Sequence, residues 1–339
     1  MSPADPRGLA TALEHLEAAL HVRRPLADDP GTTAYRLVDV GAEADWSLDT
    51  YGPDLVLGLL PDLRPPLDPT AVAHELAAGT ALAQALGRRL AARSVFLKVR
   101  PAQANTVVDA TAVGLTPPEP VFGVRTAPDG AGVVLENGLR FHVRLGEGLA
   151  TGLYLDQRDN RRWLLDQARG LRVLNTFAYT CAFSVAAAAG GAVRTVSLDA
   201  AGPALETGRA NFDLNGLLDP ERHDFLRGDV FHWLPRMAAR GDRFDLVILD
   251  PPSYSRVKQQ RFSAAQDYAA LVATALRLLA PDGRLLACTN ALGLDRRRLE
   301  QRVRDGARTA GREVVEVEPR PVALDHPSGR MKALVARFR

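Results

Sequence analysis

The segment Asp250-Pro251-Pro252 combines an acid with two prolines and directly follows an unbroken apolar run, Phe244–Leu249. Such a run predicts a strand buried on both faces of a parallel sheet. Because prolines fix φ and stiffen the turn, Asp250 could hold the amino or imino hydrogen of an aromatic base there. Tyr254 could stack on that base or only anchor the loop. Asp250, Pro251, Pro252 and Tyr254 are therefore catalytic candidates. In a domain that is not catalytic, the same Asp-Pro-Pro segment would only form a turn.

A second candidate site lies where Leu171–Thr176 runs into a short loop and then a helix. This is the place where α/β sheets bind nucleotides. An enzyme for a dinucleotide would carry G-x-G-x-x-G here, and its absence disfavours a nicotinamide-dependent oxidoreductase. S-adenosylmethionine has no phosphate and does not need these glycines. The cofactor candidates of this loop are Asn175, Phe177, Ala178, Tyr179 and Thr180.

Two acids follow the next two predicted strands. Asp199 comes after Thr195–Leu198, and Asp229 comes after Asp224–Leu226. Asp199 is placed to accept hydrogen bonds from both ribose hydroxyls of an adenosine, and Asp229 to accept one from the adenine amino group. Each acid could instead cap the helix that follows it. We expect both to bind the cofactor.

These candidates depend on a chain that alternates between strands and helices after Gly170. The predicted strands are Arg172–Asn175, Thr195–Leu198, Asp224–Leu226, Phe244–Leu249 and Leu285–Thr289. The predicted helices are Ala182–Ala189, Ala201–Asn215, Val230–Ala239 and Ala264–Leu279. Such alternation predicts a Rossmann-like α/β fold, with a parallel sheet between two layers of helices.

The first half of the chain has a different pattern. Leucines between Leu9 and Leu20 recur at helical spacing and predict a helix that ends at Arg24-Pro25. The elements expected after it are strands Tyr35–Val40, Leu55–Leu60 and Ser94–Val99 and a helix over Asp68–Arg93. A hairpin follows from Val121 to about Leu145, with turns at Pro128-Asp129-Gly130 and Glu136-Asn137-Gly138. We expect an N-terminal helix and linker (1–33), a small α+β domain for RNA or substrate recognition (34–120), a hairpin connector (121–149) and a catalytic domain (150–339).

Length and composition narrow the class of protein. A chain of 339 residues suits two domains, and 46% hydrophobic with 24% charged residues is typical of a globular protein. The net charge of +2 makes no case for nucleic acid. The two cysteines, Cys181 and Cys288, have no metal-type spacing, so we expect no metal. With no signal peptide, and apolar runs shorter than the roughly 20 residues that span a bilayer, we expect a cytoplasmic protein without a membrane partner.

Several motifs together resemble one known family. They are Glu136-Asn137-Gly138, the segment Thr151–Arg161, the loop Asn175–Thr180, the Asp250–Ser255 motif and Asp325-His326-Pro327 followed by Lys332. The chain resembles the bacterial large-subunit ribosomal RNA methyltransferases, over about residues 34–339 and most densely from Val133. Those proteins join a PUA domain, a small α+β domain and a methyltransferase domain. Their members include cytosine-C5 and guanine-N7 enzymes of 23S rRNA.

The resemblance implies a class I methyltransferase domain with a mostly parallel seven-stranded sheet, S-adenosyl-L-methionine as cofactor and an RNA substrate. In that family the segment Tyr154-Leu-Asp-Gln-Arg158 folds over the cofactor. Tyr154, Asp156, Gln157 and Arg158 are therefore pocket candidates. Arg158 and Arg161 could instead pair with nearby acids such as Asp166. Related enzymes are often dimers, which makes a homodimer a candidate assembly, but the sequence reveals no interface.

The chain departs from the family in three ways. The residues before 34 leave no room for a full PUA domain, and Cys181 stands where we expect glycine. Methylation of cytosine C5 requires a thiolate that adds to C6, and the cytosine branch carries that cysteine just after the fifth strand. Here Asn290 occupies that place, as in the guanine-N7 branch, and Cys288 lies two residues earlier, within the strand. We therefore add Asn290 to the catalytic candidates and expect no covalent cysteine intermediate.

Basic residues near these motifs are candidates for RNA contacts. Arg256, Lys258 and Arg261 follow the Asp-Pro-Pro segment, whereas Arg296–Arg298 could equally be a solvated helix face. The function that we expect is methyl transfer from S-adenosylmethionine to an RNA base, by direct in-line attack, in 23S rRNA processing. The alternatives are a methyltransferase of a small molecule or protein and a non-catalytic cofactor- or RNA-binding module.

Overall fold

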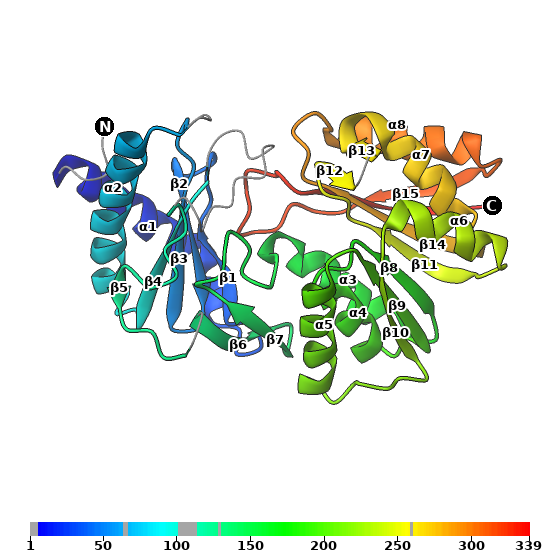
Figure 1. Ribbon diagram of the computed structural model, residues 1–339, viewed down its shortest axis with the longest axis horizontal. Helices are drawn as coiled ribbons and strands as arrows, with labels where there is room; N and C mark the ends of the chain where they lie inside the picture. The colour runs from blue at the N-terminus through cyan, green and yellow to red at the C-terminus, as the bar shows by residue number, and fades with distance from the viewer. Residues whose placement is uncertain (1–5, 64–66, 101–113, 128–129, 258–259) are drawn as a thin grey trace. The chain divides into compact units, whose positions relative to one another are not determined.

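The computed structural model describes residues 6–63, 67–100, 114–127, 130–257 and 260–339 (Figure 1). The chain divides into two compact units. Unit 1 consists of Met1–Asp156 and Leu324–Ser328, and unit 2 of Gln157–Ala323 and Gly329–Arg339. The expected four-part division is finer than this one and stays a prediction.

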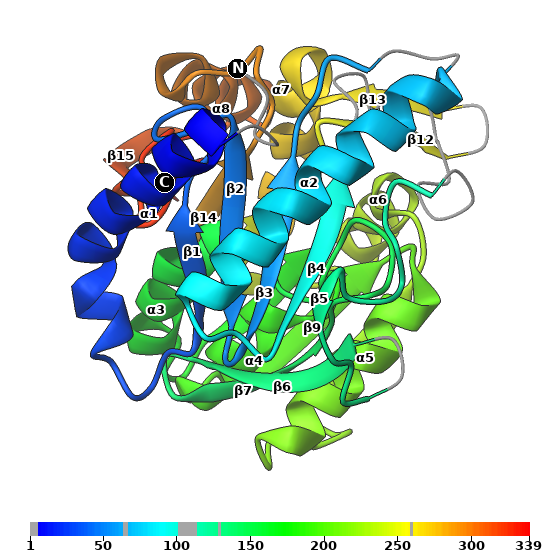
Figure 2. The ribbon, with the colours of Figure 1, turned by 90° about the vertical axis from the view of Figure 1, so that its left-hand side faces the viewer.

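Unit 1 is built on a five-stranded sheet with the order β1-β2-β3-β4-β5. Its strands are β1 (Ala34–Val38), β2 (Trp46–Tyr51), β3 (Asp54–Leu59), β4 (Ser94–Val99) and β5 (Phe122–Gly123). Only β3 and β4 pair in parallel. Helices α1 (Pro6–Ala27) and α2 (Pro69–Arg89) cover one face of this sheet (Figure 2). Three of their leucines, Leu16, Leu82 and Leu86, are fully buried against the strands.

Two features of unit 1 differ from the sequence-based expectation. Helix α1 continues past Pro25 to Ala27, because the Asp28 amide still donates to the Arg24 carbonyl at 2.9 Å. Strand β2 was not expected, because the polar and apolar residues of Trp46–Tyr51 alternate only weakly. It pairs with β1 on one edge and with β3 on the other.

The predicted hairpin is confirmed over β6 (Ala131–Glu136) and β7 (Leu139–Arg144), paired antiparallel. Its expected start at Val121 is wrong, because Phe122–Gly123 pairs with β4 as part of the five-stranded sheet. Its turn places Asn137 and Gly138 at φ 52° and 80°, the left-handed region that a tight two-residue hairpin turn requires. The other predicted turn includes Pro128 and Asp129, which lie outside the described residues.

Unit 2 contains a seven-stranded sheet with the order β10-β9-β8-β11-β14-β16-β15. Five strands are parallel, and β16 and β15 are antiparallel to their neighbours. The strands are β8 (Arg172–Thr176), β9 (Arg194–Asp199), β10 (His223–Arg227), β11 (Phe244–Leu249), β14 (Leu279–Thr289), β15 (Val314–Pro319) and β16 (Lys332–Phe338). This is the predicted Rossmann-like fold with a mostly parallel seven-stranded sheet.

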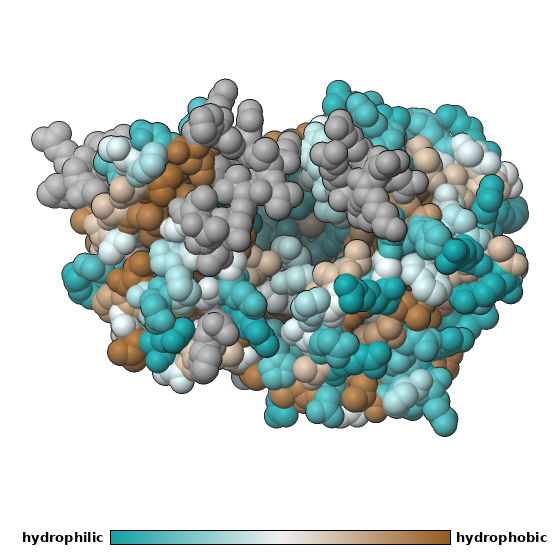
Figure 3. All heavy atoms as spheres, in the orientation of Figure 1, coloured by the Kyte–Doolittle hydropathy of each residue, from teal (hydrophilic) through white to brown (hydrophobic). Residues whose placement is uncertain are grey.

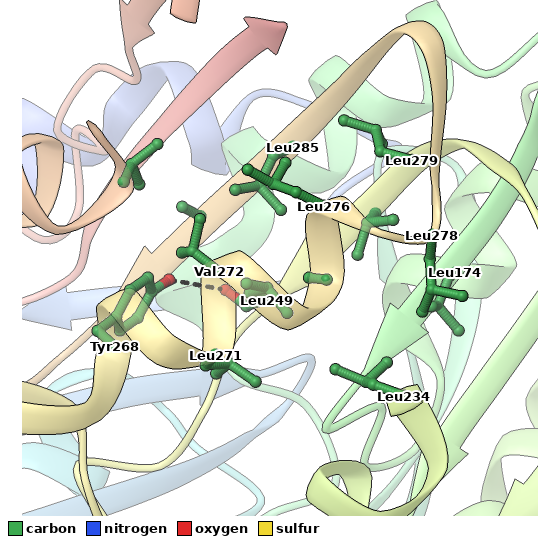
Figure 4. Close-up of a cluster of buried hydrophobic side chains, with 14 of the residues drawn as sticks. Leu174, Leu234, Leu249, Tyr268, Leu271, Val272, Leu276, Leu278, Leu279 and Leu285 are labelled. Carbon is green, nitrogen blue, oxygen red and sulfur yellow. Dashed lines mark hydrogen bonds between the residues drawn. The ribbon is translucent and has the colours of Figure 1, made fainter. Parts of the chain in front are cut away.

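In the described part of unit 2, α-helices cover the two faces of that sheet. They are α3 (Arg158–Gln167), α4 (Ala182–Ala189), α5 (Gly202–Leu214), α6 (Val230–Ala239), α7 (Ala264–Leu276) and α8 (Arg296–Thr309). Leu164 of α3 and Phe183 of α4 pack on the face that carries Val173. The opposite face carries Leu174, against which α6 and α7 pack with leucines such as Leu234 and Leu276 (Figure 4). Neighbouring residues of a strand point to opposite faces, so one sheet serves two cores.

The predicted α4, α6 and β11 have the expected bounds. The helix expected to reach Leu279 ends at Leu276, because β14 already begins at Leu279. Helices α3 and α8 and strands β15 and β16 were not located from the sequence. Tyr254 was expected in a loop, yet it opens a small hairpin of β12 (Tyr254–Val257) and β13 (Gln260–Ser263).

The segment Leu324–Ser328 leaves unit 2 and packs into unit 1. The Arg36 amide donates to Asp325 at 3.0 Å, and the Ser328 amide donates to Asp39 at 2.9 Å. Burial opposes the ionisation of Asp39, but hydrogen bonds from Ser328 and the Arg36 guanidinium outweigh it and hold the pKa of Asp39 below its usual value. The Asp-His-Pro motif is therefore a structural part of unit 1.

The surface that Figure 3 shows intersperses hydrophilic residues with smaller apolar areas. Among the described residues, no helix is long and apolar enough to cross a membrane.

Candidate active site

The carboxyl ends of the parallel strands of unit 2 lie at one edge of the sheet. Thr176 at the end of β8 is in register with Leu198 on one side and Leu249 on the other. Leu249 is in turn in register with Ala287 of β14. The loops after these strands, which carry most of the candidate residues, therefore emerge side by side, as α/β sheets require for ligand binding.

The loop after β8 has an unusual backbone. Phe177, Tyr179 and Cys181 have φ of 55°, 49° and 61°, although none is glycine, and a left-handed residue with a side chain costs about 1 kcal/mol or more. The loop is held in place, since Ala178 donates to the Leu198 carbonyl at 3.1 Å. Strain of this kind persists where the surroundings impose it and is concentrated at ligand sites.

Two polar residues flank this loop and are bound to the protein itself. Asn175 is 1% exposed and donates to Ser184 at 3.0 Å, and Ser184 also accepts from Ser197 at 2.8 Å. The Thr180 carbonyl accepts from Asn211 at 3.0 Å. These bonds tie the loop to α4, β9 and α5.

Asp199 joins the loop to the next strand end. Its Oδ2 accepts from the Tyr179 amide and its Oδ1 from the Ala201 amide, both at 2.8 Å. The N-cap of α5 is Ala201. The amide that donates to Asp199 Oδ1 belongs to Ala201 itself and not to the first turn of the helix, so Asp199 does not cap α5. A carboxylate has about four acceptor positions, and two amides leave room for two ribose hydroxyls.

Asp229, the acid after β10, does cap a helix. It is the N-cap of α6 and accepts from the Phe231 amide at 3.0 Å. The capping role that the sequence left open is therefore real, and an adenine contact would have to use the remaining acceptor positions of the same carboxylate.

Cys181 occupies the place where glycine was expected, and its φ of 61° explains that expectation. Its side chain is fully buried and packs on Gly208 of α5, where a Cβ would come within 2.4 Å of the sulfur. Burial raises the pKa of the Cys181 thiol to about 12. A thiol that stays protonated is no nucleophile at neutral pH.

Asp250 follows β11 and is held by a residue from the beginning of unit 2. Gln157 Nε2 donates to Asp250 Oδ2 at 2.9 Å. Gln157 is 1% exposed, and its Oε1 accepts from Asn160 at 2.6 Å. The amide of Gln157 is thus used within the protein, and almost none of its surface is open to a ligand.

The end of β14 is tied to the end of β11 by Tyr268 of α7. Its buried hydroxyl donates to the Cys288 carbonyl at 2.8 Å. It also lies 3.3 Å from the Leu249 carbonyl, a contact that Figure 4 marks with a dashed line. Cys288 itself lies within β14 and is 0% exposed. Sequence reasoning missed Tyr268, since a lone tyrosine in an apolar helix looks like ordinary core.

The loops after β11 and β14 are also joined through side chains. Ser253 donates from Oγ to Asn290 Oδ1 at 2.7 Å. Pro251 is buried and Pro252 is exposed, as is Tyr254, with 58% of its surface accessible. An exposed aromatic ring beside a rigid turn is available to stack on a base.

The expected cofactor segment contains one further polar group with an open position. Asp156 Oδ1 is buried and has no hydrogen-bond partner among the described residues, and a buried acceptor of this kind takes its partner from an ordered water, an ion or a ligand. Tyr154 is 52% exposed. Both belong to unit 1, and the 3-10 helix Leu155–Gln157 leads from them into unit 2.

The arginines of this segment have protein partners. Arg158 is 4% exposed and pairs with Asp159 at 3.0 Å, and Arg161 lies over the Phe183 ring at 5.7 Å. Asp166, the acid that the sequence suggested for them, pairs with Arg162 instead. A structural role for both arginines, left open by the sequence, is supported.

The candidate RNA contacts remain divided. Arg296–Arg298 are exposed in the first turn of α8, which agrees with a solvated helix face as well as with a phosphate contact. Lys258 lies outside the described residues. In the described part of the chain, no group of three or more His, Cys, Asp or Glu side chains could hold a metal ion.

Comparison with known proteins agrees with this fold. The model of the S-adenosylmethionine-dependent methyltransferase family matches residues 124–337. Ribosomal RNA large subunit methyltransferase I of Aeromonas salmonicida is 34% identical over 342 residues, which cover 96% of this chain and 80% of that protein. The protein of the same name from Photobacterium profundum is 34% identical and covers 93% of this chain and 75% of its own length.

Solved structures agree as well. A protein described as a methyltransferase and solved with S-adenosylhomocysteine has a TM-score of 0.78 and 26% identity, covering 97% of this chain and 81% of its own. A second structure with the same coverage, from Streptococcus mutans, has a TM-score of 0.79. The chain belongs to the S-adenosylmethionine-dependent methyltransferase family. Its cofactor is S-adenosyl-L-methionine, as the sequence predicted.

Proposed function

We propose that this protein methylates a base of large-subunit ribosomal RNA and so binds RNA and acts in rRNA processing. The observation that carries the proposal is Asp250, held by Gln157 at 2.9 Å in a proline-stiffened turn beside the cofactor loop. The relatives named above are ribosomal RNA large subunit methyltransferases and match nearly the whole chain. Since ribosomes are assembled in the cytoplasm, we expect the protein there.

The residues of the strand ends fit the cofactor. The free acceptor positions of Asp199 suit the ribose hydroxyls. In the loop Phe177–Thr180, the left-handed residues Phe177 and Tyr179 give the backbone an irregular course that could accommodate the cofactor. Asp229 can accept from the adenine amino group through its remaining acceptor positions. When bound, S-adenosylmethionine supplies an activated methyl group on a sulfonium.

The protein's part in the reaction is to orient a base against that methyl group. Asp250 would accept a hydrogen bond from the base. Pro251 and Pro252 would fix the position of the turn that carries Asp250, and Tyr254 would stack on the base. Asn290, bonded to Ser253 at 2.7 Å, holds the neighbouring loop. Holding two reactants in line contributes about 7–11 kcal/mol in favourable systems, so a nitrogen could attack the methyl carbon without a covalent intermediate, with S-adenosylhomocysteine as the leaving group. The proton that an exocyclic amine must lose would pass to Asp250 or to water.

A covalent cysteine step does not fit the residues at this edge. Cys288 is 0% exposed within its strand, and Cys181 has a pKa of about 12. We therefore propose direct in-line transfer to a ring nitrogen or exocyclic amine.

Some expected cofactor residues are better assigned to positioning. Gln157 and Asn175 are each 1% exposed and bonded to protein groups, so we propose that they act through Asp250 and the cofactor loop. Arg158 would likewise support α3. Tyr154 and Asp156 remain candidates for direct contact.

The proposal is tested by transfer of tritiated methyl from S-adenosylmethionine to ribosomal RNA of a strain that lacks the protein, followed by nucleoside mass spectrometry. We expect one methylated base in large-subunit RNA, and no transfer with Asp250→Ala. Labelled protein or metabolite with unlabelled RNA would show a different substrate, and no transfer despite cofactor binding would show a binding module. The candidate homodimer stays a proposal that light scattering tests.

A further inference from the structure

Leu292 stands apart from the apolar residues around it. It lies in the loop after β14 and is 89% exposed, whereas Ala291 is 4% exposed and Leu294 is 1% exposed. The loop therefore anchors its other apolar residues in the core of unit 2 and turns this leucine outward. A single exposed leucine is unremarkable by itself, so its surroundings decide what it means.

The backbone on both sides of Leu292 is held firmly. Lys332 donates from Nζ to the Ala291 carbonyl at 2.9 Å, and the Ala291 amide donates to Thr289 at 3.2 Å. On the other side the Leu294 amide returns to Ala291 at 3.2 Å, and Arg298 donates to the Gly293 carbonyl at 3.2 Å. A side chain on such a loop is presented at a fixed place instead of collapsing onto the surface.

That fixed place is next to the methyl-transfer loop. Asn290, two residues before Leu292, accepts the hydrogen bond from Ser253 of the Asp-Pro-Pro turn. The turn adds two more exposed apolar groups, Pro252 and Tyr254. Leu292 thus lies two residues from the hydrogen bond that joins its loop to the turn at which the proposed substrate must arrive.

We propose that Leu292 is a wedge that enters the RNA base stack where the target base leaves it. An enzyme cannot reach a base inside a helix and must extrude it. Leucine is among the apolar side chains that other nucleic-acid-binding proteins insert between bases. It replaces part of the lost stacking contact and has no polar atom that would require a partner. This inference rests on the proposed RNA function and deepens it.

The role makes Leu292 a positioning residue whose importance depends on RNA structure. A base that is already unpaired needs no wedge, whereas a base inside a stem does. The probes are therefore two RNAs that contain the nucleotide methylated by the wild-type protein: a hairpin with the target in its stem, and a single strand of the same local sequence.

For Leu292→Ala we expect kcat/KM to fall about tenfold or more on the hairpin and to change less than about twofold on the single strand, since extrusion from a stem costs a few kcal/mol and about 1.4 kcal/mol corresponds to tenfold. Leu292→Met should restore most of the loss. With 2-aminopurine at the target position of the hairpin, wild-type protein should raise the fluorescence and Leu292→Ala should raise it less. Leu218→Ala, at a leucine 42% exposed elsewhere in unit 2, is the matched control and should change neither substrate.

Equal losses on both RNAs, or no loss on either, would overturn the wedge and leave the proposed function intact. A difference in oligomeric state between Leu292→Ala and the wild type, measured in solution by light scattering, would also overturn the wedge. The leucine would then serve contact between copies of the chain. Absence of methyl transfer to either RNA by the wild-type protein would overturn the proposed function and the wedge with it.

Discussion

Gln157 Nε2 lies 2.9 Å from Asp250 Oδ2, across 93 positions of sequence. The bond joins the beginning of unit 2 to the end of β11. It orients the carboxylate that is central to the proposed site. Because Gln157 also accepts from Asn160, its side chain cannot swing away without leaving buried polar groups unpaired. The relationship makes Gln157 a positioning residue for Asp250.

We expect Gln157→Ala to lower kcat/KM about tenfold to a hundredfold, since a hydrogen bond to a charged group is worth about 1.5–3 kcal/mol. The loss should appear in kcat more than in the KM for S-adenosylmethionine, because the side chain offers the cofactor almost no surface. Steady-state methyl-transfer kinetics measure both. Gln301→Ala, an exposed glutamine bonded to Asp305, should leave both constants unchanged. A rise in KM alone would assign Gln157 to cofactor binding.

Tyr268→Phe removes the hydroxyl that lies between the Leu249 and Cys288 carbonyls. We expect the free energy of unfolding to fall by about 1–3 kcal/mol, because buried acceptors lose their donor. Urea denaturation followed by circular dichroism measures the change. Tyr254→Phe removes the same group from a side chain that is 58% exposed and should change stability by less than about 0.5 kcal/mol. Equal effects of the two substitutions would contradict the bridging role.

Cys288→Ala tests whether a thiol takes part in the chemistry. We expect the methyl-transfer rate to stay within about threefold of wild type, since the sulfur is 0% exposed in its strand and lies 3.9 Å from Gln157 Oε1. Stability should fall by about 1 kcal/mol through the cavity left behind. Single-turnover assays at equal folded fraction separate the two effects. Loss of activity by a factor of a thousand would reinstate the covalent mechanism.

Lys98 makes the stability of the protein depend on pH. It is buried in β4 and donates to the Gly148 carbonyl at 2.5 Å. Burial, together with Arg100, lowers its pKa to about 7, whereas an unfolded lysine has about 10.4. Between these values the unfolded chain binds more protons, so the free energy of unfolding should rise with pH from about 7 toward 10.

The Lys98 contribution is measured by urea denaturation at pH 7 and at about pH 9.5, below the titration of most tyrosines. Lys98→Met should flatten the rise by a kcal/mol or more, since each pKa unit corresponds to about 1.4 kcal/mol. Lys332, whose pKa is also lowered, is present in both proteins and cancels in the comparison. Parallel pH curves for wild type and variant would show that Lys98 titrates normally.

Much of unit 2 could be predicted from the sequence. The run Phe244–Leu249 and the helices Ala182–Ala189 and Val230–Ala239 have the predicted bounds, because apolar periodicity and the turn residues beside it are local properties. The Asp-Pro-Pro segment and the acids after the strands were found for the same reason. Each belongs to a strand end, and parallel strands bring their ends together.

Tertiary structure alone decided how these residues are held. Three contacts join segments that are distant in sequence. Gln157 pairs with Asp250, Tyr268 bridges two strand ends, and Asp325 binds the amide of Arg36 across 289 positions. The left-handed backbone at Phe177, Tyr179 and Cys181 is likewise against local preference, and the loop is held by bonds from the Tyr179 amide to Asp199 and from the Ala178 amide to Leu198. Burial removes water as a partner, so each polar group must find one wherever the folded chain supplies it, and no local pattern encodes that choice.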